Sequence, residues 1–139
     1  MLKKILFGGE NGLSAPANTA LTILRVFAGF SIMMAHGLGK MPPSPQLVQG
    51  AAGIGFPLPG VFAWAAAFSE FLGGAFLAIG LFTRVSSFFI GMTMITALLG
   101  VHYNDPYAKK ELASLYLAIA STFLIIGAND WSIDRVLRK

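Results

Sequence analysis

Four long apolar segments constrain the fold of this chain more than any other feature. They cover residues 18–37, 61–82, 85–101 and 106–127, and each approaches the roughly 20 residues that a helix needs to cross a bilayer. Only 12% of the residues are charged, against about 25% in soluble proteins. Because hydrocarbon offers no partners to backbone N–H and C=O groups, the segments must be helical. We therefore predict an all-α fold, an integral membrane four-helix bundle that forms one domain over residues 1–139.

The connections between these segments differ in length. Only Thr83 and Arg84 separate the second and third segments, which predicts a tight antiparallel hairpin, and residues 102–105 form another short turn. The stretch 41–60 is longer and is rich in proline and glycine. We expect it to be an interfacial loop after the first helix, at the outer side of the membrane, with a short half-buried helix of its own.

Local signals mark several helix ends. Ser14 is a suitable N-cap for the first helix, and Pro16 fits its first turn, where the N–H that proline lacks would be unpaired. Asp105 and Pro106 form a similar pair of N-cap and first helical residue before the fourth helix. Gly127 is a natural C-terminal stop for that helix.

The two ends of the chain carry most of the positive charge. Residues 1–13 are expected to be a short interfacial segment, and residues 131–139, which mix apolar and basic side chains, an amphipathic interfacial helix. Cytoplasmic loops of membrane proteins carry an excess of lysine and arginine. Six of the ten such residues lie on the side that holds both termini: Lys3, Lys4, Arg84, Arg135, Arg138 and Lys139. Both termini are therefore expected in the cytoplasm.

Two ionisable residues, Arg25 and Glu70, lie unmistakably within the apolar segments, away from their outer ends. A charge in hydrocarbon is costly unless it is paired or hydrated, so both side chains should face the interior of the bundle. At 1.5 Å per residue their expected depths differ by roughly 5–8 Å, which an arginine side chain can span. We predict that the two residues pair, directly or through one water. Such a pair could link two helices structurally or belong to a ligand or proton site.

One face of the first segment carries a row of polar and small residues. Arg25, Gly29, Ile32, His36 and Lys40 are spaced by four, three, four and four positions. At about 100° per residue they share one stripe along the helix. The stripe places a cation deep in the membrane, and a histidine and a lysine near its outer rim.

Polar residues of the later segments should reach the same rim. Those expected there are His36, Lys40, His102, Tyr103, Asp105 and Glu111. They could form a hydrated membrane interface that binds no ligand, or the polar entrance of an apolar cavity. A quinone suits the second arrangement, because it needs an apolar slot and one or two donors to its carbonyl oxygens. The candidate donors are His36, Lys40 and Tyr103, and the candidate walls are Phe62, Trp64 and Phe68.

Composition excludes several other kinds of function. The chain has no cysteine, which rules out disulfides, thiol redox chemistry, thiolate zinc sites and cysteine-bound iron–sulfur clusters. No basic run exceeds two adjacent residues, which argues against nucleic acid binding. His36 and His102 could in principle ligate a haem as two imidazoles. Two residues near a rim are slight support for this, so we expect neither a haem nor a metal site.

Several short motifs follow one another along nearly the whole chain, from about Leu21 to Leu137. They are Leu24-Arg25, His36-Gly37-x-x-Lys40, Ser69-Glu70-x-x-Gly73-Gly74, Gly80-Leu81-Phe82-Thr83-Arg84 and Trp131-Ser132-Ile133-Asp134. In their order and spacing they resemble the DoxX family of small four-helix bacterial membrane proteins.

The resemblance implies a bacterial inner-membrane protein connected with redox chemistry. The family takes its name from a subunit of an archaeal thiosulfate:quinone oxidoreductase, and other relatives look like membrane partners of redox proteins. The resemblance therefore implies that this chain is a membrane subunit of a quinone-linked redox complex. Its partners would be a redox protein or further copies of the chain. Because the chain lacks cysteine, sulfur oxidation by this chain alone is not expected. The positions that match the family are Arg25, His36, Lys40, Glu70 and Arg84.

Two other functions stay open at this point. In the first, the chain is a non-catalytic membrane scaffold or assembly factor, and its polar residues serve packing alone. In the second it transports a small solute, which would require oligomers, because four helices are few and no inverted repeat is visible. If the chain does bind a ligand, the candidate residues are Arg25, His36, Lys40, Glu70, His102, Tyr103 and Glu111.

Overall fold

The computed structural model describes residues 2–139, apart from the side chains of Leu2, Lys4 and Ile5. Within this part of the chain the secondary structure is helical, and one isolated antiparallel bridge joins Gly9 to Gly127. The α-helices are α1 (Leu2–Phe7), α2 (Ala15–Ile32), α3 (Pro45–Gly53), α4 (Pro59–Ile79), α5 (Thr83–Thr96), α6 (Tyr107–Ile126) and α7 (Ile133–Arg138). A π-helix, Met33–Gly37, and a 3-10 turn, Leu38–Lys40, extend α2, and a second π-helix, Ala97–Val101, extends α5.

Three continuous helical stretches are long and apolar enough to cross a membrane: Ala15–Lys40, Pro59–Ile79 and Thr83–Val101. The predicted all-α membrane fold is therefore confirmed at this level. The fourth predicted segment is also a helix, α6, and it has 20 residues. Its first turns carry Lys109, Lys110 and Glu111, which lowers its apolar character.

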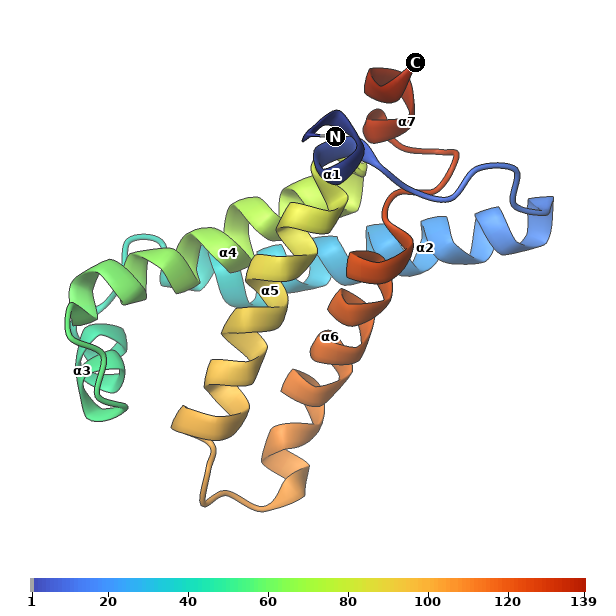
Figure 1. The fold of residues 1–139 in the computed structure, drawn as a ribbon. Coiled ribbons are helices and arrows are strands. Elements are labelled where there is room, and N and C mark those ends of the chain that lie inside the picture. The colour runs from blue at the N-terminus through green and yellow to red at the C-terminus, as the bar shows by residue number, and fades with distance from the viewer. Residues whose placement is uncertain (1) are drawn as a thin grey trace.

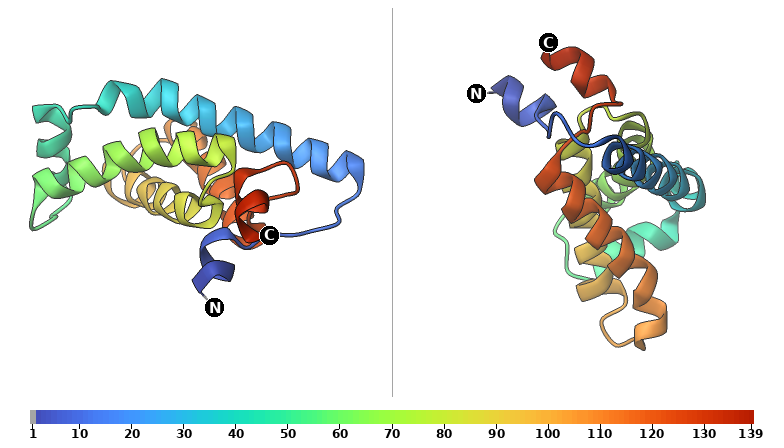
Figure 2. Two further views of the ribbon diagram at one scale, coloured as in Figure 1. Left: turned by 90° about the horizontal axis from the view of Figure 1, so that it is seen from above. Right: turned by 90° about the vertical axis from the view of Figure 1, so that its right-hand side faces the viewer.

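The long helices form two antiparallel pairs. One pair is α2 with α4, and the other is α5 with α6; α4 also packs along α5, whereas α2 makes only a small contact with α6. Figure 1 shows the pairs meeting near the end that holds α1 and α7 and spreading apart toward α3 and the α5–α6 turn. Figure 2 shows α2 and α4 side by side, with α5 and α6 extending to one side of them. The four helices thus make an open arrangement.

Two glycines set the register of α2 against α4. A Cβ atom on Gly29 would lie 2.5 Å from the backbone nitrogen of Ala78, and one on Gly37 would lie 2.5 Å from the backbone nitrogen of Phe71. Both glycines therefore allow the two backbones to approach closely, as small residues do between helices in lipid. The contacts align Gly29 with the segment Gly74–Ala78, and Gly37 with Phe71 and its neighbour Glu70.

A cluster at the end that holds both termini fixes the turn between α4 and α5. Asp134 is fully buried, and its carboxylate accepts hydrogen bonds from the backbone N–H groups of Phe82 (2.8 Å) and Thr83 (2.9 Å). Its own N–H donates to the carbonyl of Gly80 (2.8 Å). Gly80 has a φ of 71°, a left-handed conformation that glycine adopts without strain. The C-terminal segment thereby supplies the N-cap that α5 lacks in its own sequence.

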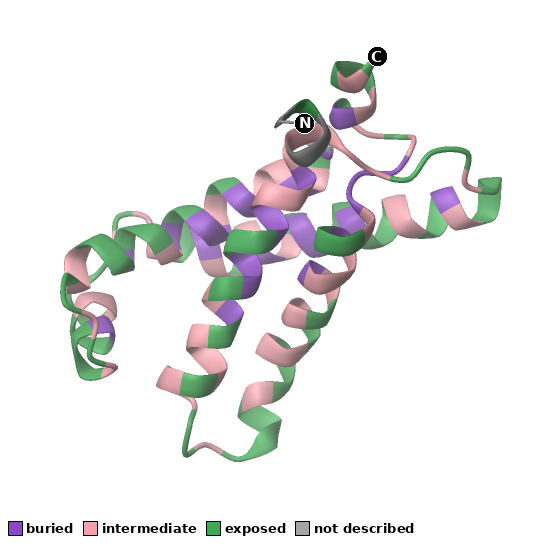
Figure 3. Ribbon diagram, in the orientation of Figure 1, coloured by how far each residue is buried: buried purple, intermediate pink, exposed green. Residues whose placement is uncertain are grey.

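The buried residues gather where the two helix pairs meet, as Figure 3 shows. At the opposite end, Ile54 connects the pairs, because its side chain packs against Gly100, where a Cβ atom would lie 2.9 Å away. The stretch 41–60 contains the expected short helix, α3, which Ser44 caps through a hydrogen bond from the N–H of Leu47 (3.2 Å). The largest cluster of buried apolar side chains comprises Ile32, Leu77, Ile90, Met94, Ala120 and Phe123.

The predicted helix ends are partly confirmed. Ser14 caps α2 through the N–H of Ala17, and Gly127 ends α6 with a φ of 76°. The prediction at the start of α6 was wrong by one residue, since Pro106 occupies the N-cap position and α6 begins at Tyr107. The carboxylate of Asp105 does not cap the helix because it bonds to His102 and Lys109 instead.

The predicted hairpin between the second and third long helices exists, but it lies earlier in the chain. The helix α4 ends at Ile79 and α5 begins at Thr83, so the turn comprises residues 80–82 and not Thr83 and Arg84. The reason is the left-handed conformation of Gly80 followed by the positive φ of Phe82 (48°), which reverses the chain before Thr83.

Substitution of Asp134 by alanine tests the role of this cluster. The change leaves one buried and one partly buried N–H group without a partner, so the free energy of unfolding should fall by about 2 kcal/mol. Denaturant-induced unfolding in detergent micelles measures the loss. The matched control is Asp130→Ala, which removes only a partly exposed ion pair of 3.5 Å with Arg135. Equal losses of unfolding free energy in the two variants would show that the Asp134 carboxylate does not stabilise the start of α5.

Candidate functional site

The best-defined polar contact within the long helices joins Lys40 to Glu70. The Lys40 ammonium donates to Oε2 of Glu70 at 2.6 Å. The Glu70 side chain is only 3% exposed, whereas that of Lys40 is 32% exposed. The register set by Gly37 explains the pair, because it aligns Glu70 with the last turns of the α2 stretch, from which the lysine reaches back. A buried carboxylate without this partner would be costly.

The predicted pairing of Arg25 with Glu70 is wrong. Arg25 is buried and donates from Nη1 to the carbonyls of Leu77 and Ala78 (both 2.8 Å) and from Nη2 to the carbonyl of Trp131 (2.7 Å). These carbonyls belong to the last turn of α4 and to the chain that follows α6.

The register of α2 against α4 gives the reason for this error. It places the guanidinium beside Gly80, where a Cβ atom would lie 2.5 Å from Nη1 of Arg25. Gly80 is ten positions from Glu70, or about 15 Å along a helix, which is well beyond the expected depth difference. The C-terminal carbonyls of a helix are unpaired and carry partial negative charge, so they satisfy the cation in place of a carboxylate.

His36 lies in the π-helix next to the Lys40–Glu70 pair and is half-buried. Its ring packs edge-on against that of Tyr116 of α6, with 5.9 Å between ring centroids. Short π-helices within α-helices frequently occur at functional sites. We call these four residues, His36, Lys40, Glu70 and Tyr116, the polar site.

Sequence reasoning missed Tyr116 as a member of the polar site. Tyr116 carries a hydroxyl group within the apolar fourth segment, and this polar group was the signal in the sequence that could have indicated a site residue. The helix that Tyr116 would contact was not evident from the sequence. The helices α2 and α6 touch only slightly, and the sequence does not show that Tyr116 meets the end of the α2 stretch.

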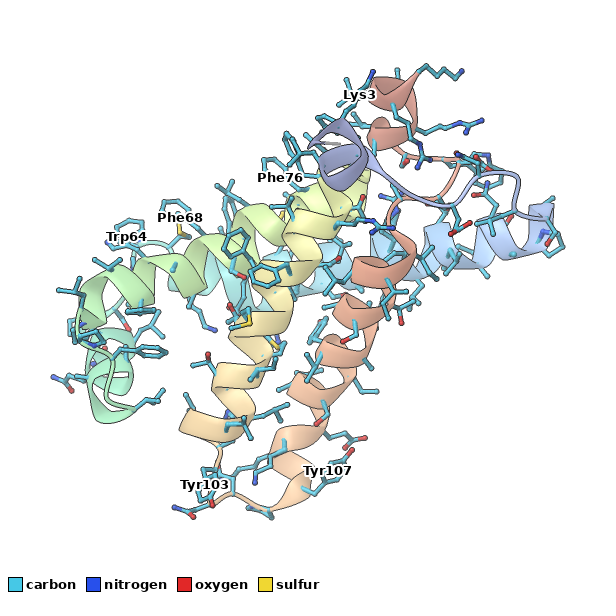
Figure 4. The ribbon with its side chains drawn as sticks, viewed as in Figure 1. Lys3, Trp64, Phe68, Phe76, Tyr103 and Tyr107 are labelled. Carbon is cyan, nitrogen blue, oxygen red and sulfur yellow. The ribbon has the colours of Figure 1, made fainter. Side chains whose placement is uncertain are left out.

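The other expected rim residues lie elsewhere, at the α5–α6 turn. His102 bonds to the carboxylate of Asp105 (2.7 Å), and this hydrogen bond lowers the pKa of Asp105 below its ordinary value, with the charge of Lys109 acting in the same direction. Tyr103 points outward and is 67% exposed, and Glu111 is also exposed. Figure 4 shows Tyr103 and Tyr107 at this turn, away from α4. The structure therefore unites His36, Lys40 and Glu70, but not His102, Tyr103 or Glu111, in one site.

An apolar groove of about 310 Å³ lies between α4 and α5. Of the three expected walls of a quinone slot, Phe68 lines this groove and Trp64 stacks on Phe68 with 5.2 Å between ring centroids. Phe62 instead stacks on Phe56 (4.1 Å). The residues that line the groove are Ala65, Phe68, Ser69, Leu72, Gly73, Phe76, Phe82, Val85, Ser86 and Phe89.

Comparison with known proteins identifies the family. The DoxX family model matches residues 20–103, which is more than half of the chain. This protein belongs to the DoxX family. It is also 31% identical, over 118 residues, to a protein of Bacillus subtilis strain 168 that is named putative oxidoreductase CatD, and the match covers 84% of this chain and 86% of that relative. No solved structure matches.

The motifs that resemble the DoxX family fall into two spatial groups. Arg25, the turn that begins at Gly80, and the segment 131–134 meet in the terminal cluster, where their bonds are to backbone groups. His36, Lys40 and Glu70 meet in the polar site. The first group thus bonds to the main chain, whereas the second contains an ion pair between side chains. Among residues 2–139, no three His, Cys, Asp or Glu side chains are placed to hold a metal ion.

A double-mutant cycle distinguishes the observed ion pair from the one first expected. Lys40→Met leaves Glu70 buried without its partner and should lower the free energy of unfolding by about 3 kcal/mol. Most of this loss should be recovered when Glu70→Leu is added. The same cycle with Arg25→Gln and Glu70→Leu should be additive within about 0.5 kcal/mol, because the two side chains share no partner. Strong coupling of Arg25 with Glu70 would contradict the structure.

Proposed function

We propose that this DoxX-family protein is the membrane subunit of a redox complex and that it binds a quinone at the polar site. The Lys40–Glu70 pair, whose carboxylate is buried, and the contact of His36 with Tyr116 carry the proposal. Ionisable residues within a membrane-spanning region are costly and commonly mark a ligand or proton pathway. The name of the Bacillus subtilis relative, an oxidoreductase, supports the redox assignment.

The polar site supplies the groups that a quinone requires. A quinone has two carbonyl oxygens that accept hydrogen bonds. The ammonium of Lys40 has three N–H groups and donates one of them to Glu70, so two stay available to a ligand. The imidazole N–H of His36 and the hydroxyl group of Tyr116 are further donors. Reduction of a quinone to a quinol takes up two electrons and two protons. In our proposal the two electrons come from a redox protein partner and the two protons come from water. His36, Lys40 and Tyr116 orient the ring, and Glu70 takes up each proton in turn and passes it to a carbonyl oxygen of the quinone.

We further propose a location and topology for the chain. It forms a single domain in the bacterial inner membrane, with α6 as a fourth spanning helix and both termini in the cytoplasm. The support is the distribution of lysine and arginine and the common position of α1 and α7 at one end of the molecule (Figure 1). The charged first turns of α6 would then lie at the opposite membrane surface, together with the α5–α6 turn.

One observation favours a second candidate, a non-catalytic scaffold. Arg25, the largest fully buried side chain among the described residues, makes its hydrogen bonds to main-chain carbonyls, so an ionisable residue in this fold can have a purely structural role. If Lys40 and Glu70 act in the same way, the polar site would bind no small molecule and would only hold α2 against α4.

Titration of a short-chain ubiquinone analogue into the purified protein separates the two candidates. Wild-type protein should bind it, and His36→Ala and Tyr116→Phe should each weaken binding about fivefold, the effect of losing one hydrogen bond of about 1 kcal/mol. The matched control is His102→Ala, which removes a histidine at the α5–α6 turn and should leave the affinity unchanged. An absence of binding, or equal weakening by the control, would favour the scaffold.

A further inference from the structure

The groove between α4 and α5 is separate from the polar site. On α4 its lining residues follow one stripe, which includes Phe68, Ser69 and Gly73. Glu70 and Gly74 lie on the neighbouring face, which packs against α2. The groove is almost wholly apolar and open on one side, and both of its helices are long and apolar enough to cross a membrane. In a bilayer it would therefore open toward the hydrocarbon.

One end of the groove is bounded by α1. Phe82, which lines the groove, contacts the ring of Phe7 at the end of α1, with 5.1 Å between centroids. The exposed Lys3 lies one helical turn before Phe7. Figure 4 shows Lys3 at the same end of α4 as Phe76, whereas Phe68 and Trp64 lie toward the other end. The groove thus runs from a cationic helix toward the middle of α4.

The surroundings of that end carry more basic than acidic side chains, and the acidic ones are Asp130, Asp134 and the exposed Glu10. Among the described residues, no carboxylate lies within 4.0 Å of Lys3. The two aspartates of the region are already engaged, since Asp134 accepts two backbone N–H groups and Asp130 lies 3.5 Å from Arg135. The lysines and arginines at this end with described side chains are Lys3, Arg84, Arg135, Arg138 and Lys139.

We propose that the groove binds one acyl chain of an anionic phospholipid, whose phosphate lies beside Lys3. An acyl chain matches the apolar walls, and a negative headgroup matches the cations at the end of the groove where a membrane surface would lie. The phenylalanine rings at positions 68, 76, 82 and 89 would flank the chain, and the small residues Ala65, Ser69 and Gly73 leave room for it. This lipid site is independent of quinone binding at the polar site.

Native mass spectrometry of the full chain in detergent tests this site. With equal amounts of phosphatidylglycerol and phosphatidylcholine of the same acyl chains, one phosphatidylglycerol should be retained preferentially. Ala65→Trp fills the groove and should abolish this retention. The matched control is Ala118→Trp, the same change at an exposed alanine of α6 outside the groove, and it should retain the lipid. Equal retention by both variants, or of both lipids, would overturn the proposal.

A headgroup variant and a fluorescence measurement complete the test. Lys3→Gln should lower the preference for phosphatidylglycerol about fivefold, while Lys109→Gln, at the opposite end of the molecule, should not.

If Ala65→Trp does not fold, Trp131→Phe isolates the fluorescence of Trp64, which stacks on the groove residue Phe68. Brominated phosphatidylglycerol should then quench Trp64 more than brominated phosphatidylcholine at equal mole fraction. Equal quenching, or a retained quinone in place of the phospholipid, would refute the lipid site.

Discussion

The close backbone contact between α2 and α4 determines where the two charges buried within the long helices, Arg25 and Glu70, find their partners. Gly29 and Gly37 allow the two helices to approach until side chains could no longer fit between them. Helices at this distance cannot slide by one turn without a clash, so the register is fixed. It brings Lys40 to Glu70 near one end of the pair and Arg25 to the carbonyl end of α4 near the other. One packing interaction therefore sets both the polar site and the terminal cluster.

The two ends of the α2–α4 pair satisfy their charges in different ways. Arg25 bonds to main-chain carbonyls, which do not titrate, so the bonds at its end of the fold do not depend on the protonation of a partner. The other end relies on two side chains, and the lysine has partial access to the surroundings. The α5–α6 pair spreads away from this second end (Figure 1). Rigid support at one end with adjustable groups at the other is a suitable arrangement for a membrane protein that binds a small molecule.

The helices and several of their ends could be predicted from the sequence, because apolar run length and capping residues are local signals. The predicted pairing of Arg25 with Glu70 was wrong because it assumed that the two segments were centred at the same depth. The actual register depends on which glycines meet, and this is a relation between segments that one sequence does not display. The same reason explains why Tyr116 and the capping role of Asp134 were missed, since both depend on contacts with distant parts of the chain. The bilayer position and the orientation stay predictions.

The unequal exposure of Lys40 and Glu70 has a chemical consequence. The carboxylate is enclosed and the ammonium is not, so a molecule that arrives from outside meets the cation first. To reach Glu70 it must offer that carboxylate a replacement hydrogen bond as the lysine turns away. Molecules that can only accept hydrogen bonds would stop at the lysine, whereas those that also carry a hydroxyl group could exchange with it. A reduced and an oxidised form of the same ring differ in this property, and the ion pair would therefore tell them apart.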